Sequence, residues 1–122
     1  MSTIICDFDG VIHSYTSGWK GADVIPDPPV PGAIEWINEM ANHFQIAIFS
    51  SRSGQDGGID EMRKYMMKHG LDTEHLRENR VFFAKDKVPA LMSIDDRGFR
   101  FNGTFPSKLE IDSFKPWNKK SV

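Results

Sequence analysis

Four short apolar runs are spaced along the chain, and each is followed by a polar segment. They cover residues 3–6, 45–49, 80–84 and 90–94. Runs of this length that are bounded by polar turns are typical of buried strands. The pattern therefore predicts four strands that end in polar residues.

Helical patterns lie between these strands. Apolar residues recur every three or four positions over 33–44 and over about 59–69, which predicts two amphipathic helices. Acids in the first turn of the second helix, bases in its last turn and Gly70 just beyond it suit the helix dipole and a glycine cap. Residues 106–114 are expected to hold a short last helix, and the alternation over 99–103 is compatible with an edge strand.

Strands that alternate with helices predict an α/β fold. We expect a mainly parallel sheet with helices on both faces, a three-layer Rossmann-like arrangement, in a single domain over residues 1–122. Residues 11–32 contain three glycines and four prolines and are expected to form a long loop. Residues 115–122 are expected to form a loosely held tail.

Composition and charge exclude several classes of protein. The chain has 122 residues, one cysteine and a net charge of −2, which argues against an intrachain disulfide and against general coating of nucleic acid. No apolar run approaches the roughly 20 residues of a membrane span, and the N-terminus lacks the basic flank of a signal peptide. We therefore expect a cytoplasmic protein with no membrane partner.

Candidate chemistry lies where the predicted strands end. The polar residues at these places are Asp7 and Asp9, Ser50 to Arg52, and Asp95 and Asp96. The carboxyl ends of parallel strands meet at one edge of a sheet, where ligands bind. Carboxylates gathered there repel each other unless a cation offsets their charge, and oxygen ligands of this kind suit Mg²⁺.

An Asp-x-Asp pair beside Mg²⁺, with serine and basic side chains, predicts phosphoryl transfer. One carboxylate can attack phosphorus and form an aspartyl-phosphate. The other can protonate the leaving oxygen and then take a proton from the water that resolves the intermediate.

The ordered set of residues resembles the four signature motifs of the haloacid dehalogenase superfamily of phosphotransferases. The matching residues are Asp7-Phe8-Asp9-Gly10-Val11, Ser50, Lys87 and Asp95-Asp96, within about residues 3–98. Ser50-Ser51-Arg52 and Ile94-Asp95-Asp96-Arg97 look especially like the phosphatase domain of polynucleotide kinase-phosphatases and their small phage or bacterial relatives. The segments where family members carry a cap are short, so the chain resembles the capless group.

The resemblance implies roles for the acids. Asp7 would be the nucleophile and a Mg²⁺ ligand, and Asp9 the general acid and base with its backbone carbonyl on the metal. Asp95 and Asp96 would anchor the metal, with Asp96 the first choice for direct ligation. Gly10 would contribute to binding of the phosphate.

The resemblance also implies roles for basic and hydroxyl side chains. Lys87 would steady the nucleophile and the phosphate, and Lys85 competes for this role. Ser50 would donate to a phosphate oxygen, and Ser51 competes with it. Arg52 would contact the phosphate.

Four further residues have two interpretations each. Cys6 lies next to Asp7, but a free cysteine in a strand is commonly part of the core. His13 and Tyr15 either contact the leaving group of a substrate or pack on the body of the domain. Trp19 is interpreted as a hydrophobic plug under the loop in preference to a stacking residue.

These observations favour a Mg²⁺-dependent phosphomonoester hydrolase, with nucleotide or oligonucleotide phosphates among the substrates that the resemblance implies. A non-catalytic binding module on the same scaffold is an alternative. A receiver-like phosphoacceptor domain is a weaker one, because receivers place the acid pair first and the lysine last. A homodimer is compatible with a small open site.

Overall fold

A computed structural model of the chain describes residues 1–119, so that residues 120–122 of the expected tail lie outside the described part. Its sheet has four parallel strands in the order β3-β2-β1-β4. The strands are β1 (Thr3–Cys6), β2 (Gln45–Phe49), β3 (Val81–Ala84) and β4 (Met92–Ile94). The predicted α/β class with a parallel sheet is confirmed, and every strand lies within its predicted run.

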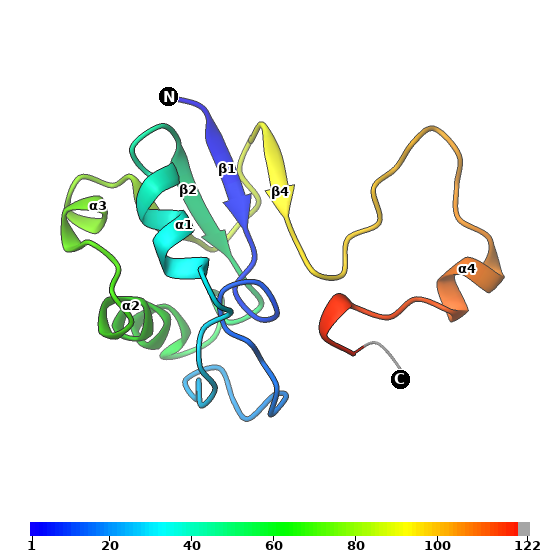
Figure 1. The fold of residues 1–122 in the computed structure, drawn as a ribbon, viewed down its shortest axis with the longest axis horizontal. Coiled ribbons are helices and arrows are strands. Elements are labelled where there is room, and N and C mark those ends of the chain that lie inside the picture. The colour runs from blue at the N-terminus through cyan, green and yellow to red at the C-terminus, as the bar shows by residue number, and fades with distance from the viewer. Residues whose placement is uncertain (120–122) are drawn as a thin grey trace.

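Three helices pack against one face of the sheet, as Figure 1 shows. They are α1 (Ala33–Met40), α2 (Gly58–Lys68) and α3 (Thr73–Arg77). Ile37 of α1 and Met66 of α2 are buried against Ile4 and Ile46 of the central strands. The predicted helices at 33–44 and 59–69 are confirmed, although α1 ends four residues earlier than the apolar pattern does.

The opposite face of the sheet carries a much smaller core. Ile5, Ala47 and Ala84 are buried there, and Val88 packs against them from the connection between β3 and β4. Crossing from β3 to β4 covers about 14 Å at ~4.8 Å per strand, and seven extended residues reach more than about 20 Å. A short coil therefore suffices, and the prediction of helices on both faces is wrong for the described residues.

The chain continues beyond β4 as an arm, which we define as residues 97–119. It holds α4 (Lys108–Asp112) and the 3-10 helix η1 (Trp117–Lys119). Figure 1 shows the arm leaving the sheet and turning back toward the first loop of the chain. The expected helix within 106–114 is confirmed, whereas residues 99–103 form no strand because no neighbouring strand pairs with them.

The described end of the arm is tied to the body of the domain. Trp117 donates from Nε1 to the Gly10 carbonyl at 2.7 Å, and Asn118 donates from Nδ2 to the Ser14 carbonyl at 3.2 Å. Trp117 and Asn118 are thus hydrogen-bonded to the first loop, and the expectation of a loosely held tail stays a prediction.

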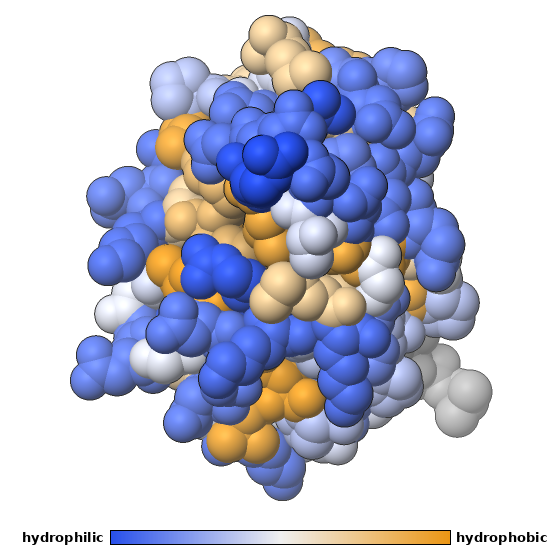
Figure 2. Space-filling view, turned by 90° about the vertical axis from the view of Figure 1, so that its left-hand side faces the viewer, coloured by the Kyte–Doolittle hydropathy of each residue, from blue (hydrophilic) through white to orange (hydrophobic). Residues whose placement is uncertain are grey.

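The outer side of the helical layer is mainly hydrophilic, with separate apolar side chains between the charged ones (Figure 2). This agrees with amphipathic helices that turn one face to the sheet and the other to solvent. None of the helices between residues 1 and 119 has the length and apolar character that crossing a bilayer requires.

Candidate functional site

Three carboxylates meet at the carboxyl end of the sheet. Asp7, Asp95 and Asp96 each place an oxygen within 4.8 Å of the others. The strand register causes this meeting: Cys6 of β1 lies opposite Ile94 of β4, and the Asp7 N–H donates to the Ile94 carbonyl at 2.9 Å. Acids that are 88 positions apart in the sequence are thereby adjacent in space.

The position of this cluster follows from the order of the strands. From β1 the chain passes to β2 on one side, and β4 returns to the other side of β1. This change of direction creates the crevice in which open α/β sheets bind ligands. Asp7 stands at its centre, directly after β1.

Gly10 makes the approach of Asp96 possible. A Cβ on Gly10 would lie 2.2 Å from Oδ2 of Asp96, and the glycine has φ +84°, which disfavours any side chain. Its N–H donates to the His13 carbonyl, and its own carbonyl accepts from Trp117. The predicted phosphate contact of Gly10 therefore does not fit the structure, because its backbone donor is already engaged.

The electrostatics of Asp7 reflect this crowding. Burial raises the pKa of Asp7 to about 7, and the neighbouring Asp96 and Asp95 contribute in the same direction. The backbone N–H of Phe8, which donates to Oδ1 at 2.8 Å, lowers the pKa but does not outweigh these causes. A cation bound among the three acids would favour the ionised form.

A cavity of about 310 Å³ opens beside the acids. Asp7 and Asp96 line it together with Asp9, Ser50 and Ser51. The Ser50 hydroxyl accepts from the Arg52 N–H at 3.2 Å and is buried, whereas Ser51 is exposed. Both serines thus remain candidates for the phosphate contact.

The two lysines that compete in the sequence are placed differently. A second cavity of about 170 Å³ lies next to the first and is lined by Lys87 with Asp7 and Asp95. Lys85 lines neither of the two cavities. Lys87 is therefore the lysine that reaches the surroundings of the acids.

Arg52 lies behind Asp9 and lines neither cavity. It is fully buried, and its Nε donates to both carboxylate oxygens of Asp9 at 3.1 and 2.9 Å. Its Nη1 donates to the carbonyls of Gly21, Ala22 and Val24 at 2.8–3.1 Å. The guanidinium thus joins Asp9 to the long loop, while its buried Nη2 has no hydrogen-bond partner among the described residues. The phosphate contact expected for Arg52 stays a prediction.

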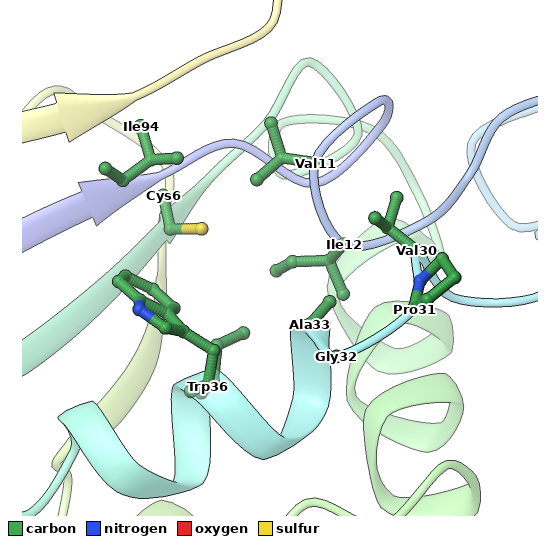
Figure 3. Close-up of a pocket in the computed structure, with 10 residues that line it drawn as sticks. Cys6, Val11, Ile12, Val30, Pro31, Gly32, Ala33, Trp36 and Ile94 are labelled. Atoms are coloured by element: carbon green, nitrogen blue, oxygen red, sulfur yellow. The ribbon is translucent and has the colours of Figure 1, made fainter. Parts of the chain in front are cut away.

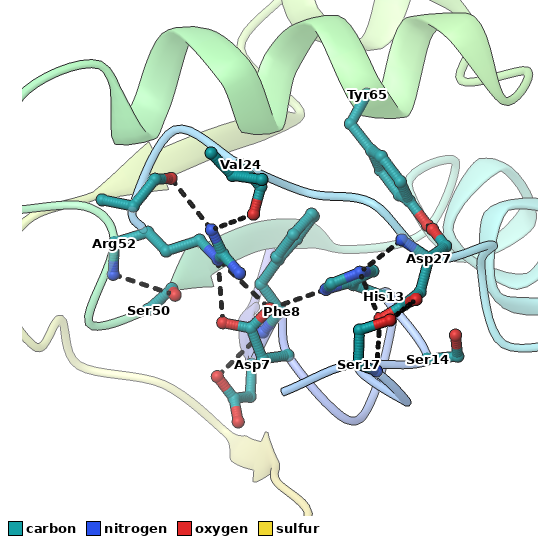
Figure 4. Close-up of polar contacts among 12 residues, drawn as sticks. Asp7, Phe8, His13, Ser14, Ser17, Val24, Asp27, Ser50, Arg52 and Tyr65 are labelled. Carbon is teal, nitrogen blue, oxygen red and sulfur yellow. Dashed lines mark hydrogen bonds and ion pairs between the residues drawn. The ribbon is translucent and has the colours of Figure 1, made fainter. Parts of the chain in front are cut away.

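His13 also contacts Asp9. Figure 4 shows the rings of His13 and Phe8 near the guanidinium of Arg52. Its Nε2 accepts from the Asp27 N–H at 3.1 Å, so the ring proton resides on Nδ1, which donates to Oδ1 of Asp9 at 2.8 Å. Burial alone would raise the pKa of Asp9, but the hydrogen bonds from His13 and Arg52 outweigh it and lower the pKa. Asp9 is therefore ionised, and its side chain is engaged away from the acidic cluster.

The loop between β1 and α1 is fixed by further polar contacts. We call residues 14–28 the site loop. Asp27 accepts from the N–H and hydroxyl of Ser17 at 2.8 and 2.5 Å, and its carbonyl accepts from the Tyr65 hydroxyl at 2.9 Å. The site loop is thus held at three places, by Arg52, His13 and α2.

Sequence reasoning left His13, Tyr15 and Trp19 open between two interpretations. His13 is buried and serves Asp9, which places it in the body of the domain. Tyr15 and Trp19 line the cavity beside the acids, so the interpretation of Trp19 as a plug is wrong. Cys6 is 1% exposed, and burial raises the pKa of its thiol to about 12, which confirms it as part of the core.

Comparison of the chain with models of known families, with curated proteins and with solved structures finds no match. The resemblance to the haloacid dehalogenase superfamily therefore stays a prediction from the motifs.

Proposed function

We propose that this chain is a Mg²⁺-dependent phosphomonoester hydrolase that acts through an aspartyl-phosphate on Asp7. The observation that carries the proposal is the convergence of Asp7, Asp95 and Asp96 beside a cavity that Ser50 and Ser51 also line. Acids, hydroxyl donors and a nearby lysine are the groups that phosphoryl transfer uses.

The donor set fits a small divalent cation. Three carboxylate oxygens lie within 4.8 Å of one another, and oxygens around Mg²⁺ at about 2.1 Å are about 3–4 Å apart. When bound, Mg²⁺ would offset the charge of the acids and of a phosphate dianion. Asp7, Asp95 and Asp96 would hold it, and the part expected for the Asp9 carbonyl stays a prediction.

The covalent chemistry belongs to Asp7. One of its oxygens forms a bond to phosphorus while the bond from phosphorus to the leaving oxygen breaks, and that oxygen takes up a proton. Water then attacks phosphorus, gives up a proton, and releases inorganic phosphate and the Asp7 carboxylate. Lys87 and the two serines, which line the two cavities, would neutralise and bind the phosphate oxygens.

The position of Asp9 favours a role in the second step of the reaction, the hydrolysis of the aspartyl-phosphate. A carboxylate that Arg52 and His13 keep ionised accepts a proton from the attacking water. Protonation of the leaving oxygen by Asp9 would require a proton on this same carboxylate. That step therefore needs one of the three hydrogen bonds from His13 and Arg52 to Asp9 to be exchanged when the substrate binds.

The test is release of inorganic phosphate from a panel of sugar phosphates, nucleoside monophosphates and 3′-phosphorylated oligonucleotides, with Mg²⁺ and with a chelator. We expect turnover only with Mg²⁺, and we expect Asp7→Asn to lose at least about 1,000-fold in kcat because it removes the nucleophile. Asp60→Asn, on the exposed side of α2, should retain full activity.

Two outcomes would contradict the proposal. A folded protein with no Mg²⁺-dependent turnover on the whole panel would favour the non-catalytic binding module. A stable phosphoaspartate after treatment with acetyl phosphate would favour the receiver-like domain. The cytoplasmic location also remains a prediction.

A further inference from the structure

Two aromatic side chains line the cavity beside Asp7, and the proposed hydrolysis does not use them. Tyr15 and Trp19 both come from the site loop. Trp19 is 45% exposed although it is among the largest apolar side chains of the domain. An exposed aromatic ring at the wall of a polar cavity is a surface on which a flat ligand can stack.

The ring of Trp19 is held in place from one side. The guanidinium carbon of Arg52 lies 4.8 Å from its centroid, a cation–π contact. Arg52 is itself fixed by Asp9 and by the carbonyls of the site loop. Binding to the remaining surface of Trp19 would therefore cost little loss of side-chain freedom.

Tyr15 has a strained backbone. Its φ of +62° is uncommon for a residue with a side chain, and such conformations cluster at ligand sites when the surrounding structure enforces them. The enforcing contacts are present, since Ser14 donates to the Pro28 carbonyl and the Tyr15 carbonyl accepts from Gly18. Its ring also packs edge-on against buried His13, with centroids 5.9 Å apart.

We propose that Tyr15 and Trp19 form a subsite for a flat ring on the leaving group of the substrate, which makes a nucleoside phosphate the favoured substrate class. This inference rests on the proposed hydrolase function. A cavity of about 310 Å³ is at the lower end of the range for small-molecule sites, which suits one ring-bearing unit. Arg97 also lines this cavity, where its Nε lies 3.9 Å from Oδ2 of Asp96.

The test compares two substrates that share the same primary phosphate ester, a nucleoside 5′-monophosphate and ribose 5-phosphate. Stacking on an aromatic side chain is lost on alanine substitution, so Trp19→Ala should lower kcat/KM for the nucleotide by about 10-fold or more. The same variant should change kcat/KM for ribose 5-phosphate by less than about 2-fold, because that substrate has no base to stack.

Two further variants separate stacking from damage to the fold. Trp19→Phe keeps a ring and should retain most of the preference for the nucleotide. Trp36→Ala is the matched control, because Trp36 is 39% exposed and lines an apolar cavity between α1 and β1 (Figure 3) that shares no lining residue with the cavity beside the acids. It should leave both substrates unaffected.

The two possible failures are distinguishable. Equal kcat/KM for both substrates in the natural protein, or equal losses on both in Trp19→Ala, would overturn the subsite and leave the hydrolase. No turnover of either substrate would overturn the hydrolase itself. A 3′-phosphorylated dinucleotide is measured in parallel. If Trp19→Ala lowers its kcat/KM more than it lowers that of the nucleoside 5′-monophosphate, the ring that stacks on Trp19 belongs to the end of a nucleic-acid strand.

Discussion

Asp7 occupies an electrostatically unfavourable place when no cation is bound. It is partly buried and faces Asp95 and Asp96, which is why its pKa is raised to about 7. In the unfolded chain its pKa returns to about 4. Folding therefore favours protonated Asp7, and the free energy of unfolding must fall as the pH rises between these two values.

We predict that Asp7→Asn removes this dependence on pH. Between about pH 4 and pH 7 the natural protein should lose up to about 4 kcal/mol more of its free energy of unfolding than the variant does. Above pH 7 the variant should be the more stable of the two in the presence of a chelator. Urea denaturation at several pH values measures both curves, and parallel curves would contradict the raised pKa.

Mg²⁺ provides an internal check on the same residue. It should stabilise the natural protein above pH 7, since a ligand that binds only the folded state raises the free energy of unfolding. The gain should be much smaller in Asp7→Asn, which lacks one of the three carboxylates, and unchanged in Asp60→Asn.

At the scale of elements, the site loop depends on one buried side chain. Arg52 donates to three carbonyls of this loop and to Asp9, and it stands between β2 and α2. The first turn of α2 packs tightly on the same segment, because a Cβ on Gly58 would lie 1.9 Å from the Arg52 carbonyl oxygen. The loop therefore inherits its order from the sheet and from α2.

We predict that Arg52→Met loosens the site loop. The variant leaves three carbonyls without this donor and leaves Asp9 with His13 as its remaining side-chain donor, which should lower the free energy of unfolding by about 3 kcal/mol or more. Limited digestion with trypsin reports on the loop directly, because exposed Lys20 lies within it. Cleavage after Lys20 should be much faster in the variant than in the natural protein or in Arg63→Met, an exposed control on α2. Equal rates in all three would show that Arg52 does not order the loop.

At the scale of the whole molecule, the arm is the least covered part of the described chain. Its large apolar side chains are exposed, among them Phe105, Leu109 and Ile111. Burial of apolar surface stabilises a folded protein by about 25 cal/mol per Å². A monomer in which these side chains stay exposed lacks this stabilisation. The homodimer expected from the sequence stays a prediction, and the arm is where it would form.

We predict that the protein self-associates at micromolar concentration and that Leu109→Ser together with Phe105→Ser weakens this association. Sedimentation velocity over a range of concentrations gives the mass of the particle. Met67→Ser, which changes an exposed apolar residue of α2, should not alter it. A natural protein that stays monomeric at high concentration would contradict the prediction.

Local patterns were sufficient for the strands and for the acidic cluster. The central strands β1 and β2 are buried along most of their length, whereas Met92 and Ser93 of the edge strand β4 are exposed. The carboxyl ends of the parallel strands bring Asp7 to Asp95 and Asp96. The prediction of helices on both faces was wrong because a coil that contains Pro89 crosses the second face of the sheet.

The roles of Arg52, His13 and Asp27 could not be read in the same way. Each is defined by hydrogen bonds to residues of other segments, and Arg52 reaches 43 positions back to Asp9. A sequence shows a charged residue after a strand, but it does not show whether that residue faces the cavity or lies behind it. Residues 99–103 alternate like a strand and form none, because a strand also needs a neighbour with free backbone groups.

The strand order also determines which parts of the fold can form first during synthesis of the chain. During synthesis β1 can pair with β2 as soon as residue 49 is free, but its other edge stays open until β4 emerges. The acidic cluster around Asp7 also cannot form before Asp95 and Asp96 have been synthesised. The hydrogen bond to the Gly10 carbonyl forms later still, because its donor Trp117 follows 107 residues after Gly10. We therefore expect the acidic cluster to stay incomplete until Asp95 and Asp96 have left the ribosome, with an exposed strand edge that must be kept from other chains in the meantime.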